Sequence, residues 1–220
     1  MHVLILAHGE MPSASLLRTL CEEADLFLAT DGAANALPDL GMAPHVILGD
    51  FDSVAARAGE LFPTAEFIHT PDQEASDLDK ALMLAIERGA TRVTLAGALG
   101  GRIDHTLVNV GLLVKYAGRL DLRIVDDWGE TRATSDSLVI SGHPGDTLSV
   151  AVFAPAEGVT LTGVRWPLHD ERLLPGSRAV SNSLVEESAR LSVREGVLIV
   201  THLRTGGADR EEEDTGEAKE

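Results

Sequence analysis

The chain has 220 residues, of which 44% are hydrophobic, a composition typical of a globular protein with one or two domains. Its formal net charge of −17 argues against nucleic acid or an anionic membrane as a partner. The sequence contains no apolar run of about 18 residues, so it predicts no membrane span. The single cysteine, Cys21, excludes an internal disulfide, so we expect a reducing, cytoplasmic location.

Short apolar runs alternate with helical patterns through the first 130 residues. The runs, rich in Val, Ile and Leu, are HVLILA, LFLAT, HVILGD, EFIHT, RVTLAG and LRIVDD. Near-continuous apolar runs of this length are typical of strands that are covered on both faces. The first run opens the chain, and we interpret it as a buried strand and not as a signal peptide.

Helices are predicted between several of these strands, at about 13–24, 76–88 and 105–116. The segment 76–88 has the clearest pattern, because its apolar residues recur at helical spacing on one face. Ser76 can cap this helix and Gly89 can end it. The alternation of strands and helices predicts a parallel, Rossmann-like α/β domain over residues 1–130.

The pattern changes from about Thr131. The runs DSLVIS, DTLSVAVFA, GVTLTGV, ARLSVREG and VLIVTHL are separated by turn residues, with no convincing helix between them. They predict a smaller antiparallel β-sandwich domain over residues 131–206. Residues 207–220 are strongly acidic and have no apolar anchor, so we expect a solvated, disordered tail.

Acidic side chains follow four consecutive predicted strands, at the edge where ligands bind in an open parallel sheet. Any one of them is readily explained as a turn residue or a helix cap. Adjacent acids such as Asp50 and Asp52, however, repel unless a cation or solvent relieves them. Together they favour a metal site, and Mg²⁺ is the natural ion because no Cys/His cluster supports zinc. The acids concerned are Asp31, Asp50, Asp52, Asp72, Asp77 and Asp104.

A glycine-rich turn, GALGGRIDH (97–105), leads into the third predicted helix. The glycines either allow a tight bend or let backbone N–H groups approach a phosphate beside a helix N-terminus. Neither a P-loop nor the common dinucleotide fingerprint is present. Arg102 strengthens the phosphate interpretation, because a guanidinium can bind phosphate oxygens with two hydrogen bonds. Lys80 is either a second cation for the site or a solvated helix lysine, and His105 either a proton carrier or a helix-start residue.

Four motifs in this order resemble those of thiamine pyrophosphokinases: DGAAN (31–35), GDFDS (49–53), PDQEASDLDKAL (71–82) and GGRIDHTLVNV (100–110). The resemblance continues with GVRWPL (163–168) and AVSNSL (179–184), and it covers about residues 1–205. The chain departs from the family pattern at Ala33, where a second glycine is usual, and at Ser183. The second departure falls in the region that selects the alcohol.

The resemblance implies transfer of pyrophosphate from ATP to the hydroxyl of thiamine, giving thiamine diphosphate and AMP. It also implies a homodimer, with the active site between the α/β domain of one subunit and the β domain of the other. The candidate catalytic acids are Asp50, Asp52, Asp77 and Asp104, and the first three are also the candidate Mg²⁺ ligands. The candidates for holding ATP and substrate are Asp31, Asn35, Asp72, Gln73, Lys80, Arg102 and His105, and those for thiamine are Ser181 and Asn182.

Three alternatives stay open. A related pyrophosphokinase for another alcohol, such as a hydroxymethylpterin, would share the α/β site and differ in the β half. A non-catalytic nucleotide or metabolite sensor on the same fold would be expected to lack one or more of Asp50, Asp52, Asp77 and Arg102, all of which are present. A hydrolase would use the same metal site with water in place of the alcohol.

Overall fold

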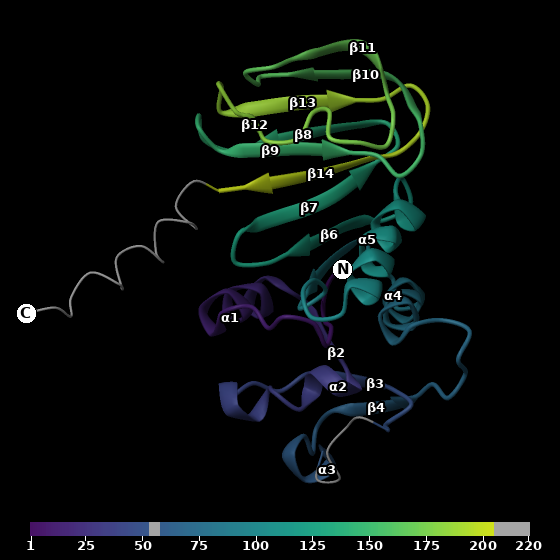
Figure 1. Ribbon diagram of the computed structural model, residues 1–220. Helices are drawn as coiled ribbons and strands as arrows, with labels where there is room; N and C mark the ends of the chain where they lie inside the picture. The colour runs from purple at the N-terminus through teal and green to yellow at the C-terminus, as the bar shows by residue number, and fades with distance from the viewer. Residues whose placement is uncertain (53–57, 205–220) are drawn as a thin grey trace, which may run out of the picture. The chain divides into compact units, whose positions relative to one another are not determined.

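The computed structural model describes residues 1–52 and 58–204, and packing divides the chain into two compact units, of which the second begins at Asp127. Each unit is described by itself (Figure 1). The first contains a parallel sheet whose strand order is β6-β5-β1-β2-β3-β4, so the order reverses between β1 and β5. Its strands are β1 (His2–Leu6), β2 (Leu26–Thr30), β3 (Val46–Gly49), β4 (Glu66–His69), β5 (Arg92–Ala96) and β6 (Asp121–Val125).

The three helices predicted from the sequence are confirmed. The Oγ atoms of Ser13 and Ser76 accept backbone N–H groups at the starts of α1 and α4. The sequence did not predict the single-turn helix α2, which begins directly after β2 and carries Asp31 at its first position. The helical segments are α1 (Ala14–Glu23), α2 (Asp31–Ala34), η1 (Pro38–Leu40), α3 (Ala58–Leu61), α4 (Asp77–Glu87) and α5 (Ile103–Tyr116).

Both faces of the central strands are buried, as the continuous apolar runs predict. Successive strand residues point to opposite faces, and in β1 the four residues from Val3 to Leu6 are all inaccessible to solvent. Leu4 and Leu6 pack in one cluster with Leu17 of α1. Helix α4 contacts β1, β2 and β3. A rigid sheet covered in this way fixes the positions of the loops at its carboxyl edge.

The second unit consists of antiparallel strands in the orders β12-β9-β14-β7 and β11-β10-β13-β8. A single apolar cluster draws residues from both sets, for example Val150 and Leu198 from the first and Val159 and Leu191 from the second. The antiparallel β prediction is confirmed. The strands are β7 (Gly129–Thr134), β8 (Ser137–Ser141), β9 (Thr147–Ala151), β10 (Ala156–Thr162), β11 (Leu168–Leu173), β12 (Asn182–Ser183), β13 (Ser188–Ser192) and β14 (Leu198–Leu203).

Within the described ranges, no helix combines the length and the apolar character that crossing a membrane requires. The predicted tail, residues 207–220, lies outside the described residues, as does Ser53 of the GDFDS motif.

Candidate functional site

A cleft of about 570 Å³ opens at the carboxyl edge of the parallel sheet. Its walls come from the segments that follow β1, β2, β3, β4 and β5, so it includes the point where the strand order reverses. Open α/β sheets bind their ligands at this point, because loops from adjacent strands diverge there and leave a crevice. Of the acids predicted to meet at this edge, Asp31, Asp50 and Asp77 line the cleft.

Three carboxylates gather at the ends of β2 and β3. One oxygen from each of Asp31, Asp50 and Asp52 lies within 4.8 Å of the others. Asp31 is buried, and its two oxygens accept the N–H groups of Gly32 at 2.6 Å and Phe51 at 3.0 Å. Gly49 is needed beneath it, since a Cβ there would lie 2.5 Å from the Asp31 carboxyl carbon. Oxygen donors this close together are chemically suited to a hard divalent cation.

Asp50 and Asp77 have pKa values shifted in opposite directions. The pKa of Asp50 is lowered by the Asp52 N–H, which donates to Oδ1 at 3.2 Å, and then by Gln73 Nε2, which donates to Oδ2 at 3.2 Å. The pKa of Asp77, at the start of α4, is raised by burial and then by the charge of Asp31. Carboxylates whose environments separate their pKa values in this way are suited to different tasks in one reaction.

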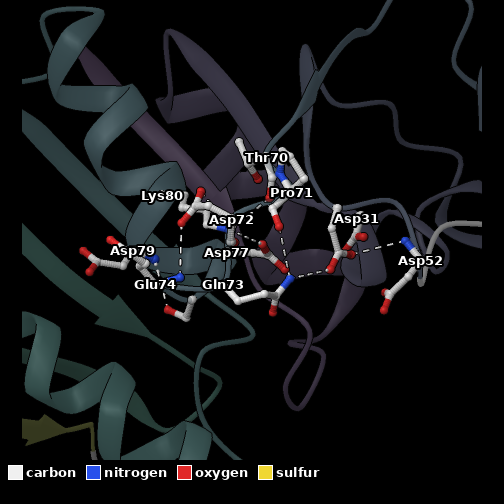
Figure 2. Close-up of polar contacts among 12 residues, drawn as sticks. Asp31, Asp52, Thr70, Pro71, Asp72, Gln73, Glu74, Asp77, Asp79 and Lys80 are labelled. Atoms are coloured by element: carbon white, nitrogen blue, oxygen red, sulfur yellow. Dashed lines mark hydrogen bonds and ion pairs between the residues drawn. The ribbon is translucent and has the colours of Figure 1, made fainter.

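Lys80 is buried, which excludes the interpretation of a solvated helix lysine. Its Nζ donates to the backbone carbonyls of Thr70, at 2.9 Å, and Asp72, and lies 3.6 Å and 3.7 Å from the carboxylates of Asp72 and Asp77. Figure 2 shows Lys80 with Asp72 and Asp77 close by, and Asp31 farther from it in that view. One lysine thus ties the segment after β4 to helix α4.

The turn after β5 carries Arg102, Asp104 and His105. Gly100 adopts φ +76°, a left-handed conformation that favours glycine. Arg102 Nε donates to Asp104 Oδ1 at 3.1 Å and Nη2 donates to Oδ2 at 2.5 Å, and these hydrogen bonds lower the pKa of Asp104 to about 2. Arg102 and His105 line the cleft, and both are exposed.

The cleft does not bring every candidate residue to its wall. Asp31, Asp50, Gln73, Asp77, Lys80, Arg102 and His105 line it, and Asp52 joins through the carboxylate cluster. Asn35, Asp72 and Asp104 are not among the lining residues. Asn35 is exposed after α2, Asp72 pairs with Lys80, and Asp104 pairs with Arg102.

In the second unit, Asn182 is buried, and its side chain forms hydrogen bonds with other residues of the chain. Its Oδ1 accepts the N–H groups of Trp166 at 3.1 Å and Ser183 at 2.9 Å, and its Nδ2 donates to the Trp166 carbonyl at 2.7 Å. Trp166 itself remains 55% exposed. Ser181 is exposed with φ +56°, and its N–H donates to Ser149 Oγ at 2.9 Å. Asn182 therefore fixes the backbone of Trp166, whose side chain stays largely exposed.

His8 and Asn109 are among the residues that line the cleft and that the sequence did not identify as candidates. His8 lies two residues after the end of β1. It can be found by inspecting the residues after every strand, including strands that no acidic residue follows. Asn109 lies on α5, seven residues beyond Arg102, and its direction depends on how α5 packs. Nothing in the local sequence distinguishes Asn109 from a solvent-facing helix residue.

Two family models match the chain. The thiamin pyrophosphokinase catalytic domain model matches residues 17–126, and the thiamin pyrophosphokinase vitamin B1 binding domain model matches residues 138–198. A thiamine pyrophosphokinase of Bacillus subtilis is 27% identical over 187 residues, which cover 81% of this chain and 87% of that protein.

Solved structures add a likeness of fold over nearly the whole chain. A crystal structure of thiamine pyrophosphokinase from Bacillus subtilis has a TM-score of 0.81 at 25% identity, covering 93% of this chain and 100% of that one. A thiamin pyrophosphokinase structure from Geobacillus thermodenitrificans has a TM-score of 0.80 at 27% identity, covering 94% and 99%. On the matches of both family models, the chain belongs to the thiamine pyrophosphokinase family.

Proposed function

We propose that this chain is a thiamine pyrophosphokinase, an enzyme that transfers pyrophosphate from ATP to the hydroxyl of thiamine and releases AMP. The observation that carries the proposal is the carboxylate cluster of Asp31, Asp50 and Asp52, which lies at the cleft of a unit matched by the family's catalytic domain model. Phosphoryl-transfer enzymes depend on charge neutralisation and alignment more than on covalent help from the protein.

We propose Mg²⁺ as the metal. Asp31, Asp50 and Asp52 would hold it, with Asp77 available from the same cleft. Mg²⁺ prefers oxygen ligands and is usually shared with substrate phosphates, whose negative charge it offsets. Asp31 lies close enough to Asp50 and Asp52 to join the candidate Mg²⁺ ligands. The sequence predicted Asp31 only as a substrate-binding residue.

The remaining groups in the cleft position the reactants. Arg102 offers its guanidinium to phosphate oxygens. The thiamine hydroxyl attacks the β-phosphorus, the bond from that phosphorus to the oxygen of the α-phosphate breaks, and AMP leaves with this oxygen. The hydroxyl proton passes to a carboxylate, for which Asp77 is the candidate because burial raises its pKa. Gln73 and Lys80 hold Asp50 and the segment after β4 in place.

Other candidate residues support these groups. Asp104 orients Arg102 by two hydrogen bonds. Asn35, Asp72 and His105 stay proposed substrate-binding residues, supported by the motif resemblance.

The second unit is proposed to bind thiamine. The indole of Trp166 is exposed, and Asn182 holds its backbone, so the ring offers a face on which the aromatic rings of thiamine can stack. Ser181 directly precedes Asn182 in the chain. We further propose a homodimer in which the second unit of one subunit completes the active site of the other. The first unit would act as a Rossmann-like nucleotide-binding domain, and the single cysteine supports a cytoplasmic location.

The test is to incubate the purified protein with ATP, Mg²⁺ and thiamine and to separate the products by chromatography. We expect AMP and thiamine diphosphate in equal amounts, neither without thiamine, and neither with Asp52→Asn. Asp79→Asn is the matched control, because the Asp79 carboxylate binds Lys115 and Tyr116 on α5 and lies outside the lining of the cleft. AMP formation with a hydroxymethylpterin in place of thiamine, or nucleotide binding without any turnover, would instead support one of the alternatives.

A further inference from the structure

Asn109 lies on α5, lines the cleft and is only 7% exposed. Its Nδ2 donates to the carbonyl of Ala98 at 2.7 Å, in the turn that follows β5. A carbonyl can only accept a hydrogen bond, so this contact fixes which way the amide of Asn109 faces. The Oδ1 atom is therefore directed away from Ala98.

The Oδ1 atom of Asn109 has no hydrogen-bond partner within residues 1–52 and 58–204. It is nevertheless not sealed off, because in those ranges Thr70 Oγ1 is the one fully buried side-chain oxygen or nitrogen that lacks a partner. Oδ1 therefore keeps some exposure, and because Asn109 lines the cleft, a ligand in the cleft can reach it. A ligand that covers it without donating a hydrogen bond would leave it unsatisfied, which is costly.

The position of Asn109 along the strand order indicates which part of a ligand meets it. The carboxylate cluster follows β2 and β3, whereas Ala98 and Asn109 lie at the end of β5, on the other side of β1. Two strand spacings, about 9–10 Å, separate the ends of β5 and β2. The cleft extends from the carboxylates to the turn after β5, where Arg102 can still reach the phosphates. A nucleotide that fills the cleft and has its metal-bound phosphates at the carboxylates can therefore extend its nucleoside toward Asn109. Phosphate groups at neutral pH accept hydrogen bonds and hardly donate them. They therefore cannot supply the donor that Asn109 Oδ1 requires.

We propose that Asn109 is a nucleotide-binding residue whose Oδ1 accepts a hydrogen bond from the nucleoside half of ATP. The donor is either an N–H group of the base or an O–H group of the ribose. The inference rests on the proposed function for the identity of the nucleotide. It adds a residue that selects the nucleoside, whereas the acidic residues of the cleft serve the phosphates and the metal.

The experiment compares the protein with its Asn109→Leu variant, which has a similar volume and neither donor nor acceptor. Calorimetry without thiamine measures the binding of ATP and of three analogues that each lack one donor: purine riboside triphosphate, 2′-deoxy-ATP and 3′-deoxy-ATP. We expect the variant to bind ATP about tenfold more weakly, which corresponds to about 1.4 kcal/mol. For one analogue the variant should bind at least as tightly as the unmodified protein, because leucine has no acceptor to leave unsatisfied, and that analogue identifies the donor.

Two results would overturn the inference: unchanged ATP binding by Asn109→Leu, or an equal loss for ATP and all three analogues, which marks a purely structural role. Asn109→Asp covers the case in which the leucine variant does not fold. It keeps an acceptor oxygen and loses the donor to Ala98, so it should still distinguish ATP from the identifying analogue. Because binding is measured without turnover, a failure of the inference and a failure of the proposed activity are separate results.

Discussion

Phe51 lies between the two acids of the carboxylate cluster in a left-handed conformation, with φ 63°. Such a backbone costs about 1–3 kcal/mol for a residue other than glycine and persists where the surroundings hold it. Its N–H donates to Asp31, and its ring stacks on His69 with 5.6 Å between centroids. The turn that results brings Asp50 and Asp52 to within reach of Asp31. Strain at this residue accompanies the crowding of charge that the proposed metal would relieve.

Replacement of Asp77 by Asn is expected to stabilise the metal-free protein at neutral pH. The pKa of Asp77 is raised in the folded state, so its ionised form opposes folding above that pKa. The stabilisation should shrink as the pH falls through the folded-state pKa and vanish below the unfolded value near 4, where both states are protonated. Thermal unfolding across pH measures this, and because Asp77 is partly exposed the rise should not exceed about 2–4 °C. A midpoint that falls at neutral pH would contradict the account.

At the scale of elements, Asp79 joins α4 to α5. Its carboxylate accepts Lys115 Nζ at 2.6 Å and the Tyr116 hydroxyl at 2.8 Å. Asp79→Asn weakens both hydrogen bonds, and we expect it to lower the free energy of unfolding by about 1–2 kcal/mol with little change in KM for ATP. Denaturant unfolding tests this against Glu87→Gln, an exposed acid on the same helix. Equal effects of the two variants would show that Asp79 does not couple the helices.

In the second unit, the hydrogen bonds from Asn182 hold the backbone of Trp166. Asn182→Ala leaves the Trp166 N–H and carbonyl without these partners, so the indole should lose its fixed position. We expect the KM for thiamine to rise about tenfold while the KM for ATP changes little, and Trp166→Leu should show the same split. Steady-state kinetics with each substrate varied in turn provides the measurement. A parallel rise in both KM values would indicate general loss of structure.

At the scale of the whole molecule, the net charge of −17 makes cations stabilising in general, so a specific metal site must be separated from screening. We expect Mg²⁺ to raise the unfolding midpoint more than NaCl of equal ionic strength does. At about 100 times its dissociation constant, a bound ion contributes about 2.7 kcal/mol. The excess should disappear in Asp50→Asn. An excess that survives this substitution would place the ion elsewhere.

Much of the fold and part of the candidate site are predictable from sequence because they depend on local pattern. Strand ends are marked by apolar runs, and this places Asp31, Asp50 and Asp77 at one edge. The burial of Lys80 and the direction of Asn109 are not predictable in this way, because each depends on how a helix packs against the sheet. The role of Asn182 was also unforeseen, since a motif does not show whether a side chain contacts a ligand or another residue.

ATP labelled at its γ-phosphate, followed during turnover with thiamine, shows directly which group is transferred. We expect the label in thiamine diphosphate and an equal amount of AMP, because attack falls on the β-phosphorus and both terminal phosphates move together. Formation of ADP with labelled thiamine monophosphate, or release of the label as free phosphate or pyrophosphate, would contradict it.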